Sequence, residues 1–262
     1  MKFSKLYTIL EAISPADIKA MMNGGENADD LQDCETVIKL DQPTKTSKHG
    51  NWGMSLATID SCPFSGDCKK SCFKNQIETR FPEGVAEKTK NNMELVEAEK
   101  TTKKMADLLQ RSILAERRAA RSSIFRLHNG GDFFSGTYFD AWIEVANRMP
   151  NKLFYTYTTS IPLWVKRLDK LPSNFVITAS YDTNEYGKKL ILKHKLKTAI
   201  VVNTREQADY LDLEVDKIDD LAWGGDESFA LLEHGGMTKN TEKQRITDRI
   251  PEVKKFLDEL RS

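Results

Sequence analysis

The sequence has few cysteines, no net charge and no long apolar run. Four cysteines occur among 262 residues, too few for the disulfide framework of a small secreted protein. No segment approaches the roughly 18 consecutive apolar residues of a membrane-spanning helix, so no membrane partner is expected. The 39 basic residues balance the 39 acidic ones, so any contact with nucleic acid must come from a local patch.

Several common functional motifs are also missing. The sequence has no P-loop, no glycine-rich dinucleotide fingerprint and no G-x-S-x-G nucleophile turn. It also has no internal repeat and no low-complexity linker. The first 15 residues place apolar side chains at helical spacing, and no small-residue cleavage site follows them. We therefore expect a first helix in place of an export signal, and a reducing, cytoplasmic location.

Short apolar segments alternate with helical patterns from residue 124 onward. The spacing predicts strands over 124–128, 153–158, 175–180, 198–202 and 220–223, each followed or preceded by one helix. This alternation is typical of βαβ units with a parallel sheet, and the unbroken apolar character of the strands indicates that both faces are buried.

The front of the chain is less regular. Strands are expected over 36–40 and 52–59, and the charged segment 83–120 predicts one long helix or two. We predict an α/β fold, a TIM-barrel-like parallel barrel, complete or partial, formed as a single domain. Its parts are an N-terminal helical extension (1–35), a barrel-like core (36–248) and a closing helix (249–262).

Polar and glycine residues follow the predicted strands, where parallel α/β folds place their chemistry. The interpretation as a site gives catalytic roles to three acids, and the alternative for each acid is a helix cap. The catalytic candidates are Asp132, Asp182 and Asp226. The substrate-binding candidates are Arg126, Gly130, Gly131, Ser180, Gly224 and Gly225.

Three of the four cysteines fall within eleven residues, as Cys62-x5-Cys68-x3-Cys72. Three thiolates on one short loop can bind a metal, with His128, Cys34, water or substrate in the fourth position. Zinc is the favoured ion, and an iron–sulfur cluster with one open iron is the alternative. The simpler interpretation is three free cysteines in a surface loop.

The order of these motifs resembles the phage gene-product-eighty-eight family over roughly residues 44 to 185. The matching residues are Ser47, Lys48, Cys62, Pro63, Cys68, Cys72, Arg126, His128, Gly131, Asp132, Phe133, Tyr157, Thr158, Ser180 and Asp182. The resemblance implies a phage protein that acts in the host cytoplasm.

The strand ends are also distantly similar to those of tRNA-guanine transglycosylase-like enzymes. That similarity implies a transferase that exchanges guanine in DNA for a 7-deazaguanine, with an aspartate attacking C1′. The implied partners are nucleic acid, with DNA favoured over tRNA, and a modified-base small molecule. The sequence predicts no particular oligomeric state.

Two alternatives accompany this hypothesis. Radical S-adenosylmethionine enzymes also carry three cysteines after the first barrel strand and a glycine-glycine-acid motif after the second, which Gly130, Gly131 and Asp132 match. A third hypothesis is a non-enzymatic, metal-stabilised nucleic-acid-binding protein. Its nucleic-acid-binding surface would comprise the arginines of 111–121 and the lysines of 188–197. The alternative interpretation of the arginines is a solvated helix face.

Overall fold

The computed structural model describes residues 37–43, 50–233 and 240–262. The helical extension predicted over 1–35, together with Cys34, Ser47 and Lys48, lies outside the described residues. Seven strands form one sheet in the order β1-β2-β3-β4-β5-β7-β6, and every neighbouring pair is parallel. They are β1 (Trp52–Ser55), β2 (Ile124–Gly130), β3 (Leu153–Thr158), β4 (Phe175–Ser180), β5 (Thr198–Val202), β6 (Val215–Asp216) and β7 (Phe229–Leu232).

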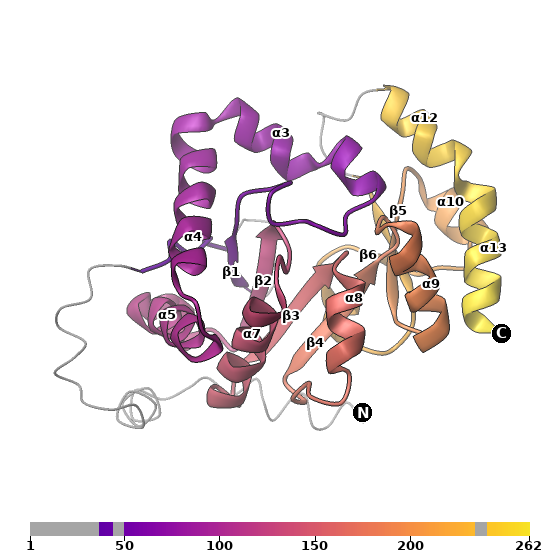
Figure 1. Ribbon diagram of the computed structural model, residues 1–262. Helices are drawn as coiled ribbons and strands as arrows, with labels where there is room; N and C mark the ends of the chain where they lie inside the picture. The colour runs from indigo at the N-terminus through magenta and orange to yellow at the C-terminus, as the bar shows by residue number, and fades with distance from the viewer. Residues whose placement is uncertain (1–36, 44–49, 234–239) are drawn as a thin grey trace, which may run out of the picture.

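The sheet curls into a half-barrel with helices packed around it (Figure 1). Among the described residues, β1 and β6 are the two edge strands and do not pair with each other. The predicted α/β fold with a parallel sheet is confirmed, whereas the described strands do not close a TIM barrel.

Helices fill the connections between the strands. Before β2 lie η2 (Asp67–Ser71), α3 (Phe73–Arg80), η3 (Pro82–Ala86), α4 (Glu87–Ala98), α5 (Thr102–Ala115) and α6 (Arg117–Arg121). Later connections hold α7 (Gly136–Arg148), α8 (Ile161–Trp164), η4 (Val165–Arg167), α9 (Glu185–His194), α10 (Arg205–Tyr210) and α11 (Asp220–Trp223). The chain continues through α12 (Asn240–Asp248) and α13 (Ile250–Arg261). None of the described helices is long and apolar enough to cross a membrane.

Alternating residues of the strands build two cores, one on each face of the sheet. On the outer face, Phe125 of β2 and Phe154 of β3 each lie 6.0 Å, ring centre to ring centre, from Trp142 of α7. On the inner face, Tyr155 belongs to a smaller apolar cluster that includes Ala222 of α11. The short helix α11 therefore occupies part of the space inside the half-barrel.

Two predicted strands are wrong. Residues 37–40 have no regular structure, and the chain next to them makes one antiparallel bridge, in which the Asp41 N–H donates to the Gly53 carbonyl at 2.7 Å. The segment 220–223 is helix α11. A four-residue apolar run does not distinguish a strand from a buried helical turn, and here the Asp216 carboxylate accepts the N–H groups of Leu221 and Ala222 and so favours the helix.

Strand β2 is irregular near its end. Gly53 of β1 is opposite Arg126 of β2, and Ser55 of β1 is opposite Gly130 of β2. Between these two pairs β1 advances by two residues while β2 advances by four. A bulge of this kind resets the alternation of side chains along a strand. As a result His128 lies on the outer face with Thr156, whereas Arg126 lies on the inner face with Tyr155.

Candidate functional site

The three cysteines lie on residues 61–72, which we call the cysteine loop. It follows β1 and runs along the carboxyl-terminal rim, the edge at which strands β1 to β5 end (Figure 1). On the β2 side, the Asp132 N–H donates to Ser61 Oγ at 3.3 Å. Gly131 has a φ of 83°, and a Cβ there would lie 2.5 Å from Ser61 Oγ. Only glycine meets both the backbone angle and the close contact.

The other side of the cysteine loop is fixed at the end of β4. The Asp182 carbonyl accepts the N–H groups of Gly66 at 3.0 Å and Cys68 at 3.5 Å. The Asn184 N–H donates to the Phe64 carbonyl at 3.0 Å. A Cβ on Gly66 would lie 2.5 Å from the Thr183 carbonyl oxygen. The cysteine loop therefore spans the rim from β2 to β4.

The three thiols of the cysteine loop are free and partly buried. Cys72 is the N-cap of α3, and its sulfur accepts the Asn75 N–H at 3.4 Å. A hydrogen bond between Cys68 and Cys72 lowers the pKa of Cys72 and raises the pKa of Cys68. Burial, followed by the nearby Asp132 carboxylate, raises the pKa of Cys62 to about 12. The loop thus gathers the three sulfurs within range of one another's charge.

No single-ion site is formed by these side chains as they stand. Among the described residues, no group of three or more His, Cys, Asp and Glu side chains converges closely enough to hold one metal ion. The predicted ligand His128 is only 4% exposed, and both of its ring nitrogens have partners, Tyr138 Oη at 3.0 Å and Thr156 Oγ1 at 3.3 Å. Burial lowers the pKa of His128 to about 3. His128 is thus a core side chain with both ring nitrogens engaged, and its role as a metal ligand stays a prediction.

Asp132 lies at the rim and is 3% exposed. Its Oδ1 accepts the Phe133 N–H at 2.7 Å and the Thr158 hydroxyl at 2.6 Å. Its Oδ2 accepts the Thr159 N–H at 2.7 Å and the Thr159 hydroxyl at 2.6 Å. Burial raises the pKa of Asp132, and these four donors oppose that rise. The carboxylate ties the end of β2 to the end of β3.

Asp182 also lies at the rim, beyond the end of β4. Its carboxylate forms an ion pair with Arg249, which immediately precedes α13. Arg249 also donates to the Val201 carbonyl at 3.0 Å. Ser180, the last residue of β4, accepts the Thr183 N–H through its carbonyl at 3.2 Å. The predicted roles of Asp182 and Ser180 in chemistry remain predictions.

The two glycines at the end of β2, Gly130 within the strand and Gly131 just after it, serve close packing. A Cβ on Gly130 would lie 2.4 Å from Cγ of Lys74, whose stem crosses above the strand end from α3. Gly131 makes the contact with Ser61 described above. The glycine pair therefore admits α3 and the cysteine loop to the rim.

Gly224, Gly225 and Asp226 lie at the amino-terminal ends of the strands, opposite the carboxyl-terminal rim. They precede β7, and Lys197, which precedes β5, donates to the Gly225 carbonyl at 2.8 Å. The prediction that these residues follow a strand and share a mouth with Asp132 is wrong. It depended on a strand over 220–223, which is helix α11.

Arg126 belongs to a polar network on the inner face. Its Nη1 donates to Asp219 at 2.9 Å, and its guanidinium carbon lies 5.0 Å from the ring centre of Tyr157. The hydroxyls of Tyr155 and Tyr157 donate to the same carboxylate at 2.9 and 2.8 Å. The Asn51 side-chain amide donates to Tyr155 Oη at 3.0 Å.

The family model described as Gene product 88 matches residues 31–249. The chain belongs to the Gene product 88 family. The Gene 88 protein of Mycobacterium phage L5 is 29% identical over 123 residues, which are 44% of this chain and 51% of that protein. The chain therefore spans about half the length of that relative. No solved structure matches. The resemblance to this family predicted from the sequence is confirmed, and the similarity to transglycosylases stays a prediction.

Sequence reasoning missed three acids of this Gene product 88 chain. Asp219 organises the inner-face network. Asp41 accepts hydrogen bonds from Lys88 and from the Ser55 hydroxyl, each at 2.5 Å. Glu78, buried on α3, accepts the Thr89 hydroxyl at 2.9 Å and bonds Thr58. Glu78 and Asp219 do not follow a predicted strand, so no positional signal indicated them, and Asp41 follows the segment 36–40, whose prediction as a strand is wrong.

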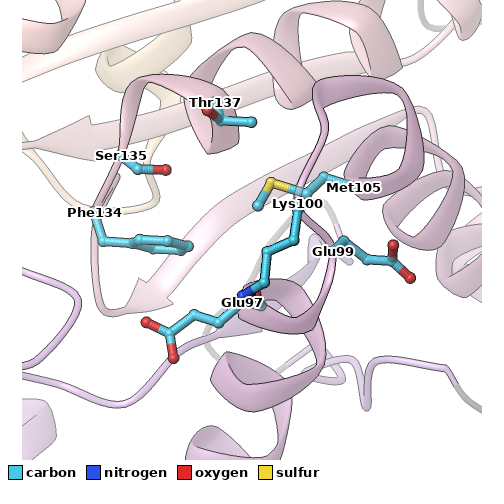
Figure 2. Close-up of a pocket in the computed structure, with 7 residues that line it drawn as sticks. All are labelled: Glu97, Glu99, Lys100, Met105, Phe134, Ser135 and Thr137. Carbon is cyan, nitrogen blue, oxygen red and sulfur yellow. The ribbon is translucent and has the colours of Figure 1, made fainter.

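A separate pocket of about 450 Å³ lies on the flank of the molecule (Figure 2). It opens between the turn joining α4 to α5 and the segment entering α7, with Lys100 and Phe134 on its walls. The Lys100 ammonium donates to the Glu97 carbonyl at 2.6 Å. This pocket contains no residue of the cysteine loop and none of the predicted site residues.

Proposed function

We propose that the chain is an iron–sulfur enzyme similar to the radical S-adenosylmethionine enzymes, with Cys62, Cys68 and Cys72 as the cluster ligands. One observation carries the proposal. A loop that follows the first strand of a parallel half-barrel gathers three free thiols at the carboxyl-terminal rim. This is the edge at which parallel α/β folds place their chemistry.

The donor set suits a cluster better than a single ion. Soft thiolates bind iron–sulfur clusters and zinc alike. A tetrahedral zinc ion holds its sulfurs at about 2.3 Å and so requires them to converge on one point, which the described side chains do not do. A cluster of several irons spreads its thiolate ligands further apart, so Cys62 and the Cys68–Cys72 pair need not converge.

Three protein ligands leave one iron of a four-iron cluster open to a small molecule, and a cluster bound here would supply one-electron chemistry. The chain's own residues have supporting tasks. Asp132 fixes the ends of β2 and β3 beneath the loop. The Asp182 carbonyl fixes the far side of the loop. The half-buried thiols limit access of water to a bound group.

Base exchange by an aspartate nucleophile has less geometric support. Both oxygens of Asp132 are engaged by four donors, and the Asp182 carboxylate is paired with Arg249. Asp226 lies at the amino-terminal ends of the strands, away from the carboxyl-terminal rim. DNA remains the partner that the sequence predicts.

The test is the metal content of the full chain purified without oxygen. We expect about four irons per chain and a visible absorption band that dithionite bleaches. Replacing any one of Cys62, Cys68 and Cys72 with alanine should remove most of the iron. Cys34→Ser, which changes the remaining cysteine, is the matched control and should leave iron content unchanged.

A colourless protein holding about one zinc ion, lost in the same three variants, would contradict the proposal and make base exchange on duplex DNA the next assay. A protein that holds no metal would return the cysteines to the interpretation of free thiols in a loop.

A further inference from the structure

We infer that Arg126 is an oxyanion-binding residue on the inner face of the half-barrel, and that the ligand carries a carboxylate or a phosphate. The inference rests on the proposed function only in taking that ligand to be the substrate.

Only one edge of the Arg126 guanidinium is used by the protein. Nη1 donates to Asp219 at 2.9 Å. Among the described residues, Nε is buried without a hydrogen-bond partner and Nη2 makes no hydrogen bond. Buried N–H groups in proteins are almost always paired, so an orphaned one calls for a partner. Nε and Nη2 together form the side-on fork that binds both oxygens of a carboxylate or phosphate.

Arg167, on the outer face, is an arginine of the same chain whose fork is filled, whereas Nε of Arg111 and Nε of Arg249 are, like that of Arg126, buried without a partner. Arg167 too has an acidic partner, Asp140, and lies over an aromatic ring, Phe139, at 5.3 Å. Its fork is filled, however, because Nε and Nη2 donate to the two oxygens of Asp140 at 2.6 and 2.9 Å. Its Nη1 donates to the Leu163 carbonyl at 2.9 Å.

The surroundings of Arg126 hold its open fork in a fixed position. Asp219 receives donors from Arg126, Tyr155 and Tyr157, so the guanidinium has little freedom to rotate. The Arg126 side chain keeps 29% of its surface exposed, although its Nε atom is itself buried. A guanidinium held in place with Nε and Nη2 unused is arranged to bind a planar oxyanion through two parallel hydrogen bonds once the ligand reaches it.

Strand β2 connects this fork to the cysteine loop. Arg126 points to the inner face, and the strand then ends at Gly130, beside the loop. A ligand held by its anionic group on Arg126 would extend along the inner face toward the thiols at the rim. One strand thus carries Arg126 in its middle and reaches the cysteine loop at its end.

The experiment follows the arginine Nε–H signals of the full chain by ¹⁵N nuclear magnetic resonance, assigned by through-bond correlations. The chain is titrated with sodium phosphate, with sodium acetate and, as an ionic-strength control, with sodium chloride. The Arg126 signal should shift with at least one oxyanion and not with chloride, while the Arg167 signal stays in place. The anion that binds at lower concentration identifies the group as phosphate or carboxylate.

Two matched variants complete the test. Arg126→Lys keeps the charge but removes the fork, and should weaken oxyanion binding about tenfold or more. Arg167→Lys should leave binding unchanged. Equal binding by wild type and Arg126→Lys, or no shift of the Arg126 signal with either oxyanion, would overturn the inference. If Arg126→Lys does not fold, the wild-type shifts alone decide. The measurement is independent of iron, so an iron-free chain that still binds oxyanion would sink the cluster proposal and keep this one.

Discussion

Replacing Asp132 with asparagine tests whether its carboxylate stabilises the fold or serves only in a chemical reaction. Each oxygen of Asp132 accepts one backbone N–H, from Phe133 or from Thr159, at 2.7 Å. The amide nitrogen of asparagine is itself a donor. Whichever oxygen the amide nitrogen replaces, it faces a buried backbone N–H, which is a donor and cannot accept a hydrogen bond. Asparagine therefore leaves at least one backbone donor unpaired in either orientation.

The cost follows from the number of bonds affected. An unsatisfied buried donor costs about 1–3 kcal/mol, and the remaining bonds lose the strengthening that the negative charge provides. We expect Asp132→Asn to lower the free energy of unfolding by about 3 kcal/mol, which for a chain of this length lowers the Tm by roughly 6–12 °C. Urea titration and thermal melting followed by circular dichroism measure both quantities.

Asp140→Asn is the matched control. It changes an acid of the same kind that pairs with Arg167 on the outer face and is 39% exposed, so it should cost no more than about 1 kcal/mol. An Asp132→Asn protein that unfolds within about 0.5 kcal/mol of wild type would refute the structural role argued here. In that case the carboxylate would be free for chemistry, as the sequence predicts.

Two further predictions concern buried positions. Lys152 is fully buried, and its side-chain nitrogen donates to the carbonyls of Ala119, Ala120 and Ser122. Burial lowers the pKa of Lys152 to about 7. Between pH 7 and about 10 the unfolded chain therefore binds a proton that the folded chain has lost. The contribution of Lys152 to the free energy of unfolding should rise by about 1.4 kcal/mol per pH unit over that window and fall as the pH drops toward 7. Urea unfolding at pH 7 and 9 should show this rise in wild type but not in Lys152→Met. The same change of unfolding free energy with pH in both proteins would contradict the prediction. Gly131→Ala should cost about 2 kcal/mol or more, because the methyl group meets Ser61 and Leu56 as well as an unfavourable φ. Gly225→Ala, at a φ of 78° with no atom within 4 Å, carries the backbone cost alone, so melting curves in which the two variants lose equal stability would exclude the clash.

The middle of the fold was predictable because its strands are continuous apolar runs flanked by helical patterns. The segments 153–158, 175–180 and 198–202 coincide with β3, β4 and β5. The two ends of the sheet were not. Strand β7 is a four-residue run, FALL, and β6 has two residues. At that length local pattern is weak, and pairing with β5 decides the structure.

The candidate site was predictable only where it depended on strand ends. The cysteine loop, Asp132 and Asp182 do lie at one rim. Asp226 was misplaced together with its strand, and His128 was misplaced because a bulge in β2 reverses the direction of its side chain. Asp219 has a φ of 64° in a short polar connection. Nothing in the local sequence indicated that this connection folds back onto the inner face.

The double attachment of the cysteine loop has a consequence for the order in which the chain is assembled. During synthesis, residues 61–72 emerge long before the end of β4, to whose Asp182 carbonyl they bond. Asp182 in turn pairs with Arg249, which lies 67 residues further along the chain. Contacts between residues so distant in sequence form late in folding. The thiols therefore reach their final positions only after residues as far as Arg249 are present, and any inorganic group they hold is inserted after strands β1 to β4 have paired.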